Sequence, residues 1–360
     1  MINHMRKFDA YIRNSVLMAM LLVLLVLAGL DFLFTVFDEL GGTNERYQTS
    51  DALQYVLLTF PRHVYDLLPM TALMGSLIGL SVLASSNELV VMQAAGVKTG
   101  RIVWAVMKPA ILVMVIGLIL GEFVTPPLDL RAEVNKTVAS SDEVILSNLG
   151  RWQRDGNDFL HFNAIEPEGV LHGVSIYSFN DEQKLTENII AESARYQDGS
   201  WLLEDVRRTL FTQSEEGLLS ELQVLPELGW DVDLSPELLQ LMIVDSDSLS
   251  ISDLYRYARR SKEQGQDANA YLMDFWEKAL QPLATAVLVL VAISFIFGPL
   301  REATMGSRVF TAVSFGLLFI ILQQLFSTVG LVYQLNPFLA VLTPILMSGC
   351  LGVYLLKVSE

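Results

Sequence analysis

Six stretches of the chain, each of about 18 or more mostly apolar residues, dominate its hydrophobic pattern. Such runs are typical of helices that cross a bilayer, because about 20 helical residues match the thickness of its hydrocarbon core. The predicted spans are Val16–Phe37, Leu67–Ala84, Ile102–Val124, Ala279–Gly298, Val309–Tyr333 and Phe338–Leu356. Asp31 in the first span costs roughly 3 kcal/mol, which its aliphatic neighbours outweigh. Gly75 and Gly79 place small residues on one face of the second span, which suits close helix packing.

The pattern changes between the third and fourth spans, where short apolar or alternating runs predict strands from about Ser140 to Leu234. The runs are Phe159–Ile165, Val174–Phe179, Leu185–Tyr196, Trp201–Thr212 and Leu218–Leu225. Turn pairs such as Asp155-Gly156 and Asp198-Gly199 separate them. Strands spaced by about 8–12 residues with such turns indicate a β-sandwich or jelly roll. The fold class is therefore membrane α + β, with a β-jelly-roll or sandwich domain inserted between the third and fourth of six transmembrane helices.

The chain thus divides into four parts. Residues 1–125 hold spans one to three, 126–249 the β domain, 250–278 connecting helices, and 279–360 spans four to six. Ser250 and Asp253 have the spacing of a capping box, which predicts a helix start, and Gly265 predicts its end.

Basic residues at the two termini and in two of the short connections fall on one side of the predicted bilayer. They are Arg6, Lys7 and Arg13 before the first span, Lys98 and Arg101 in the second connection, Arg301 and Arg308 in the fourth, and Lys357 after the last span. Short cytoplasmic segments of membrane proteins are rich in Lys and Arg. We therefore expect both termini in the cytoplasm and residues 126–278 on the opposite, periplasmic side.

The composition agrees with a membrane protein and argues against several kinds of partner and site. The chain is 52% hydrophobic and 18% charged, with a mean hydropathy of +0.42. Pro126–Lys278 holds 29 acidic and 13 basic residues, a net charge of −16 that equals the net charge of the whole chain. This acidity argues against a nucleic-acid partner, which needs basic patches. Cys350 is the only cysteine and the four histidines are scattered, so we expect no metal site and no catalytic residue.

The connection between the second and third spans carries the most specific local signal. Ser85 and Glu88 have capping-box spacing, and Gly96 fits a helix stop, so a helix of about ten residues is predicted over 85–96. It is too short to span the membrane and too apolar to lie bare in water. Its apolar face must pack into its own bundle or into a groove on a partner. Glu88 is either a capping carboxylate alone or also a contact to that partner.

This arrangement of six spans, an outer domain and a short cytoplasmic helix resembles the LptF/LptG permease family, the paired membrane subunits of the lipopolysaccharide exporter. The resemblance covers nearly the full length, is weakest in the β domain, and is closer to the LptG branch. The matching segments are Asn87–Gly96, Leu249–Ser252, Gly265–Ala268, Trp276-x-Lys278-x3-Pro282, Ser294–Arg301, Ser314–Gly316 and Gln324-x-Phe326.

The resemblance implies a function and a set of partners. The chain would be a permease subunit in the inner membrane of a Gram-negative bacterium, extracting lipopolysaccharide from the outer leaflet and passing it toward the outer membrane. It would pair with an LptF-like sister permease, an LptB-like ATPase dimer and an LptC-like single-span protein. ATP and Mg would be bound by the ATPase, and no cofactor by this chain. Lys98-Thr99 lacks the glycine frame of a nucleotide-binding loop, which agrees with this division of labour.

The resemblance also implies site residues. The ATPase-coupling helix would use Ser85, Asn87, Glu88, Leu89, Val91, Met92 and Gly96. The first and fifth spans would line the lipid gate, with Phe32, Leu68, Phe319 and Phe326 as apolar cavity candidates. The family often has basic residues at the outer end of the first span, where this chain has Asp31, Asp38 and Glu39. Phosphate contacts would then come from Arg62, Arg131 or Lys136, or from the partner subunit.

Two other functions remain open from the sequence. A non-transporting scaffold or signal-transmitting subunit would also anchor an outer β domain in the membrane. An intramembrane enzyme acting on lipids would need a polar cluster facing the interior of the helix bundle. The predicted spans carry too few titratable groups to favour the enzyme.

Overall fold

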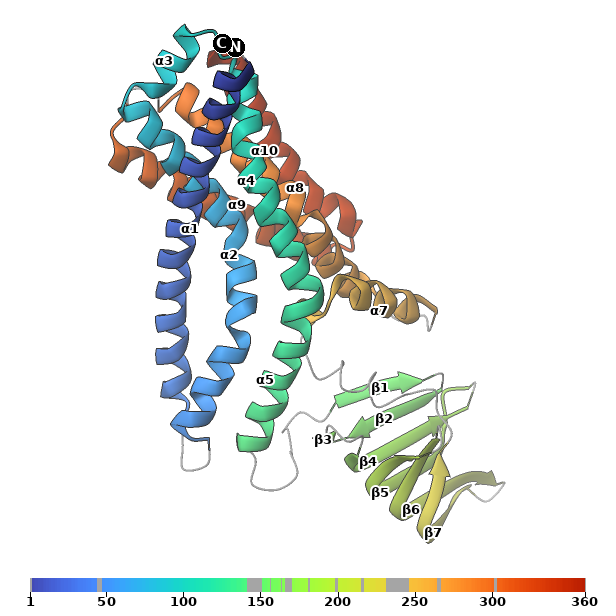
Figure 1. Ribbon diagram of the computed structural model, residues 1–360. Helices are drawn as coiled ribbons and strands as arrows, with labels where there is room; N and C mark the ends of the chain where they lie inside the picture. The colour runs from blue at the N-terminus through green and yellow to red at the C-terminus, as the bar shows by residue number, and fades with distance from the viewer. Residues whose placement is uncertain are drawn as a thin grey trace.

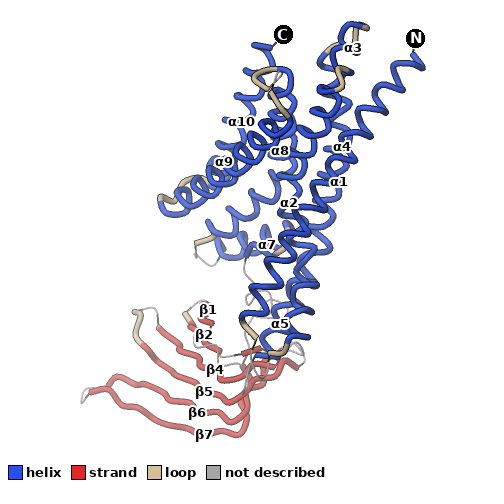
Figure 2. The backbone as a smooth tube through the Cα atoms, turned by 90° about the vertical axis from the view of Figure 1, so that its left-hand side faces the viewer, coloured by secondary structure: helices blue, strands red, loops and turns tan. Residues whose placement is uncertain are grey.

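The computed structural model describes residues 2–43, 47–140, 151–155, 157–162, 164–165, 170–180, 182–197, 200–214, 217–230, 246–263, 267–300 and 303–359. It is an elongated bundle of helices with a β sheet at one end (Figure 1). The N-terminus, the C-terminus and the short helix α3 (Glu88–Ala94) lie together at the other end of the bundle. The side view in Figure 2 shows the same separation between α3 and the sheet.

Six helices are long and apolar enough to cross a membrane, which confirms the six predicted spans. They are α1 (Ile2–Gly41), α2 (Thr49–Ser85), α4 (Thr99–Ile119), α8 (Asn269–Phe297), α9 (Met305–Val332) and α10 (Pro337–Ser359). The third span continues from α4 through one π-helical segment, η1 (Leu120–Val124), into α5 (Thr125–Ser140). Several helices extend past the predicted apolar runs, because polar residues continue the helix beyond the hydrocarbon core.

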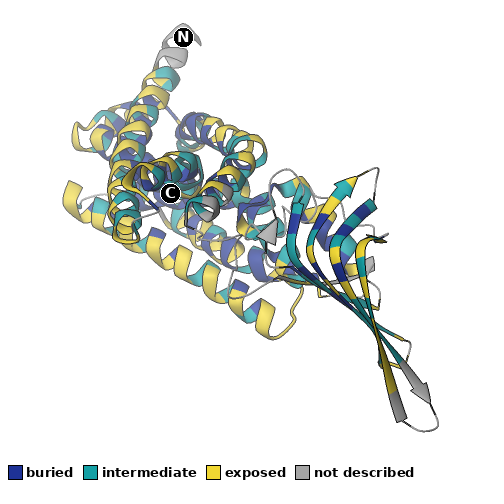
Figure 3. Cartoon of the chain, turned by 90° about the horizontal axis from the view of Figure 1, so that it is seen from below, coloured by how far each residue is buried: buried dark blue, intermediate teal, exposed yellow. Residues whose placement is uncertain are grey.

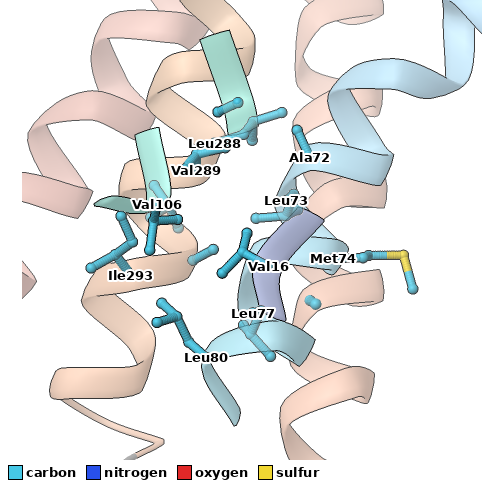
Figure 4. Packing of buried hydrophobic residues seen from close by; sticks show 14 of the residues in the cluster. Val16, Ala72, Leu73, Met74, Leu77, Leu80, Val106, Leu288, Val289 and Ile293 are labelled. Carbon is cyan, nitrogen blue, oxygen red and sulfur yellow. The ribbon is translucent and has the colours of Figure 1, made fainter. Parts of the chain in front are cut away.

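The helices α1 and α2 pack closely because α2 presents glycine toward α1. A Cβ added at Gly75 would lie 2.6 Å from the Cα of Met20, and one at Gly79 would lie 2.8 Å from the Cα of Val16. No larger residue fits there without moving a backbone, so the predicted role of this glycine pair in helix packing is confirmed. The surrounding core joins α1, α2, α4 and α8, and Figure 4 shows Val16 among apolar side chains from these helices.

The inserted domain is an antiparallel sheet. Its strands are β1 (Arg151–Asp155), β2 (Asp158–Phe162), β3 (Ala164–Ile165), β4 (Val170–Phe179), β5 (Leu185–Gln197), β6 (Ser200–Ser214) and β7 (Gly217–Trp230). The spatial order is β1-β2-β4-β5-β6-β7, with β3 beside β4, so neighbours in space follow one another in the chain. The predicted insertion of a β domain between the third and fourth spans is confirmed. Among the described strands the connectivity is a meander, without the crossovers or second sheet of the jelly roll that was expected.

The sheet buries one apolar cluster of its own. Leu160, Ile176, Trp201 and Leu203 are almost fully inaccessible, and Trp201 pairs across the strands with Trp230. In Figure 3 the buried positions lie in the middle of the curved sheet, while long stretches of the helices are exposed. The sheet therefore has a core separate from that of the helices.

The chain returns from the sheet to the membrane through a short 3-10 turn, η2 (Ser246–Ser248), and helix α7 (Ile251–Glu263). The backbone N–H of Asp253 donates to Ser250 Oγ at 3.0 Å, and Ser250 Oγ lies 2.6 Å from Asp253 Oδ2. These contacts confirm the predicted helix start at Ser250. The predicted stop, Gly265, lies outside the described residues. In Figure 1, α7 runs across the bundle rather than along it, near the start of α8.

Candidate functional site

The helix α3 lies between the second and third spans, as predicted, and its end is well defined. Gly96 has φ +87°, a left-handed conformation that glycine adopts without strain. Its N–H donates to Gln93 O at 2.9 Å, and the N–H of Val97 donates to Met92 O at 3.0 Å. These two bonds form a Schellman motif, so the predicted stop at Gly96 is confirmed.

The start of α3 differs from the prediction. Ser85 is the last residue of α2, and its hydroxyl donates to Val82 O at 2.9 Å rather than to α3. Asn87, at φ +56°, is the residue before the helix, and its side chain makes no capping hydrogen bond. The predicted capping box of Ser85 and Glu88 is therefore wrong, because the hydrogen bonds of α2 continue to Ser85 and shorten α3 to seven residues.

The two faces of α3 have different roles. Leu89 and Met92 are buried in the helix-bundle core, whereas Val90 and Val91 are 49% and 66% exposed. Glu88 is partly exposed at the first position of the helix. Leu89 and Met92 pack α3 against its own bundle. Val90, Val91 and Glu88 form an exposed apolar surface with one carboxylate, called the α3 ledge below.

A groove of about 440 Å³ runs beside this ledge. It is lined by Phe8, Tyr11, Ser86, Glu88, Val91 and Met92. A bidentate ion pair fixes the α1 side of the groove, since Arg101 on α4 donates to both carboxylate oxygens of Asp9 at 2.9 and 3.1 Å. The surface at this end of the bundle therefore combines α3 with the start of α1, which the sequence did not predict.

The four predicted cavity residues are distributed over the bundle. Leu68 and Phe319 are buried in its core. Phe32 on α1 packs edge to face against Phe60 on α2, with ring centroids 5.5 Å apart, and Phe326 on α9 is partly buried. Phe319 also lines a pocket of about 310 Å³. Their assignment to a lipid cavity stays a prediction.

The three predicted phosphate contacts lie on α2 and α5, and two of them already have acidic partners. Arg62 donates to Asp247 and Ser248. Lys136 Nζ lies 2.7 Å from Glu39 Oε1, while Arg131 is exposed. A phosphate at Arg62 or Lys136 would therefore compete with a carboxylate that the chain itself supplies.

Asp31 and Glu39 in the second half of α1 also have partners within the chain. Asp31 Oδ2 lies 2.9 Å from His63 Nδ1 on α2. Tyr47 donates to Glu39, and its burial together with this hydrogen bond raises the pKa of Tyr47. These contacts hold α1 to α2, so the acids there have a structural role.

A pocket of about 310 Å³ near η2, which sequence reasoning missed, gathers charged residues from three elements. It is lined by Arg62 and Asp66 of α2, Asp247 of η2, and Asp274, Glu277 and Lys278 of α8, with apolar residues of α8 and α9 including Phe319. The expectation that the bundle interior holds too few titratable groups was wrong. The predicted spans began at Leu67 and Ala279, whereas α2 begins at Thr49 and α8 at Asn269. The charged residues in these initial segments therefore lay outside the predicted spans.

Three charged side chains of this pocket accept hydrogen bonds from groups beside it or donate hydrogen bonds to them. Lys278 Nζ donates to Leu249 O at 2.6 Å, Ser246 donates to Asp274, and Ser327 donates to Glu277. The lining contains no histidine or cysteine. The pocket is thus a network of ion pairs and hydrogen bonds that ties η2 to α2 and α8.

These features define a polytopic membrane protein with a short apolar helix at one end and a β domain at the other. The family profile described as "Lipopolysaccharide export system permease LptF/LptG" matches residues 10–358. The chain is 35% identical over 340 residues, 93% of its length and 94% of the relative's, to the lipopolysaccharide export system permease protein LptG of Escherichia coli K12. It is 32% identical over 343 residues to the LptG protein of Haemophilus influenzae, covering 94% and 95% of the two chains.

The chain belongs to the LptF/LptG family of lipopolysaccharide export permeases, and its relatives here are LptG proteins. It is accordingly an inner-membrane, multi-pass permease of the lipopolysaccharide transport system. Both the family and the closer likeness to the LptG branch that the sequence motifs indicated are confirmed.

Proposed function

We propose that this chain is the permease subunit that extracts lipopolysaccharide from the outer leaflet of the inner membrane and passes it toward the outer membrane. A separate LptB-like ATPase dimer drives the step by binding ATP and Mg. An LptF-like sister permease completes the cavity, and an LptC-like single-span protein with its own β domain receives the lipid. Both termini are cytoplasmic and the sheet is periplasmic.

The observation that carries the proposal is the placement of α3 at the opposite end of the bundle from the sheet (Figure 1). An ATP-driven exporter needs a contact surface for the ATPase on the cytoplasmic side and a path for the lipid on the other. The ledge of Val90, Val91 and Glu88 supplies the first. Glu88 hydrogen-bonds to Tyr11 across the groove, so a partner seated there would meet this carboxylate and the Tyr11 hydroxyl together.

The buried face of α3 connects it mechanically to the spanning helices. Leu89 and Met92 belong to the same apolar core as Val16 and Leu77, so a push on α3 acts on α1 and α2 together. Arg308 adds a polar link, since its guanidinium donates to Ser81 O on α2 at 3.2 Å and to Leu300 O at 3.1 Å. Closure of the ATPases would thus narrow the cavity that α1 and α9 of this chain form with the sister subunit.

Reconstitution tests the proposal. The chain is purified with its copurifying partners and placed in proteoliposomes that contain lipopolysaccharide, and transfer to a soluble β-domain acceptor is measured with and without ATP. Transfer that needs ATP supports the proposal. A complex that assembles fully but transfers no lipid with ATP contradicts it and favours the scaffold function.

A further inference from the structure

The helix α7 has a charge opposite to that of the segment around it. Between Pro126 and Lys278 the net charge is −16, yet α7 alone carries four of the 13 basic residues and two acids. The basic residues are Arg256, Arg259, Arg260 and Lys262. Three of these are exposed, while Leu254 and Tyr257 on the other face are buried. A helix with one apolar and one basic face is typical of a membrane surface.

The position of α7 along the bundle agrees with such a surface. Its first turn is held by Glu122 in the π-helical segment of the third span, which accepts from Ile251 N at 2.9 Å and from Ser252 Oγ. Its buried face packs on the start of α8, through Tyr257 and Tyr271. Glu122 lies two residues before the end of the predicted third span, Ile102–Val124, which is the end farther from α3 and suits a helix at the membrane surface.

A pocket of about 670 Å³ opens where the last turn of α7 meets the outer ends of α8, α9 and α10. Its polar lining is Lys262, Asn269, Gln334 and Asn336, and its apolar lining is Leu272, Trp276, Leu335, Pro337 and Phe338. The rings of Trp276 and Phe338 pack edge to face with centroids 4.7 Å apart. Tryptophan is enriched at the membrane–water interface, where its ring lies beside headgroups and its edge beside acyl chains.

We propose that this pocket, with the basic face of α7, binds a phosphate-bearing lipid of the leaflet farthest from α3. Lys262 and the neighbouring amides hold the phosphate, and the first acyl carbons lie against Trp276 and Phe338. Arg256 and Arg259, exposed on the same helix, add positive potential beside the pocket. The pocket lies at the turn that joins α9 to α10, and lipid binding there can be measured without a transport reaction.

Native mass spectrometry of the full-length chain with its copurifying partners tests the site. The complex is titrated in detergent with phosphatidylglycerol or with phosphatidylcholine, and the retained lipids are counted. A basic residue near an anionic lipid surface is worth a factor of about five in affinity. Lys262→Glu is therefore expected to weaken phosphatidylglycerol retention by about fivefold or more, with little effect on phosphatidylcholine.

The matched control is Lys184→Glu, a charge reversal at a lysine that is 57% exposed in the turn between β4 and β5. This variant is expected to retain phosphatidylglycerol as wild type does. Equal retention by Lys262→Glu and wild type, or no preference of wild type for phosphatidylglycerol, would overturn the proposal. Displacement of the lipid by millimolar inorganic phosphate would overturn its lipid part, because the acyl contacts would then contribute nothing.

Discussion

The buried ammonium of Lys278 donates a hydrogen bond to the carbonyl oxygen of Leu249, 2.6 Å away. Leu249 immediately follows η2, where the chain returns from the β domain, and Lys278 lies in the fourth span, 9% exposed. The ring of Tyr65 on α2 lies 5.9 Å from the same nitrogen. This one side chain therefore joins the segment that follows the β domain to α2 and α8.

Lys278→Met is expected to lower the melting temperature of the purified protein by several degrees. It leaves the carbonyl of Leu249 without its donor and removes a positive charge from a pocket rich in carboxylates, a loss of about 1.5–3 kcal/mol. Differential scanning fluorimetry in detergent measures the shift. Lys184→Met, at an exposed lysine, is the control and should change it little; equal shifts would mean that the buried bond contributes no stability.

Gly75→Ala is expected to separate α1 from α2. The new methyl group would lie 2.6 Å from the Cα and the Cγ of Met20, so one helix has to move. Overpacking of this kind costs about 1–3 kcal/mol and should also impair lipid release, since α1 is proposed to line the gate. Gly29→Ala on α1 is the control, because nothing lies within 4 Å of its added methyl. Unchanged melting and activity for Gly75→Ala would refute the close packing.

Glu88→Lys is expected to weaken binding of the ATPase while the protein stays inserted and folded. The change reverses the single charge on the exposed ledge of α3 and leaves Leu89 and Met92 in the core. Copurification of the ATPase with a tagged variant from detergent is the measurement. Glu221→Lys on the exposed surface of β7 is the matched charge reversal. ATPase yields that match wild type for both variants would argue against α3 as the docking element.

Gly96→Ala is expected to loosen the end of α3. Alanine at φ +87° is strained by about 1 kcal/mol or more although no atom lies within 4 Å of its methyl, so the loss is conformational rather than steric. ATP hydrolysis should then become less coupled to lipid release, measured as lipid released per ATP. Gly100→Ala, at a glycine with equal space and a helical backbone, should keep wild-type coupling. A normal ratio in Gly96→Ala would rule out a fixed α3 end as part of coupling.

Local signals in the sequence were enough to predict the spans, most of the strands and two helix boundaries. The apolar runs predicted all six spanning helices, Ser250 predicted the start of α7, and Gly96 predicted the end of α3. Each of these depends on residues that are near neighbours in the chain. The strand β1 was missed because Arg151–Asp155 lacks the apolar alternation of the other strands.

The remaining features depend on residues that are distant in the sequence. Arg62 and Asp247 are 185 residues apart, and Glu122 and Ile251 are 129 apart, so no local pattern pairs them. The predicted start of α3 was wrong for a different reason. Ser85 fits either the end of one helix or the start of the next, and only the hydrogen bonds of α2 decide between them.

The most direct test of the account is the side of the membrane on which α3 and the sheet lie. Cys350 is first replaced by Ser, and Val91→Cys and Glu221→Cys are made separately, both at exposed positions. A membrane-impermeant maleimide is added to cells whose outer membrane alone has been made permeable. The account predicts labelling at position 221 and none at position 91 until the inner membrane is opened. Labelling of both positions, or of neither, before that step would contradict it.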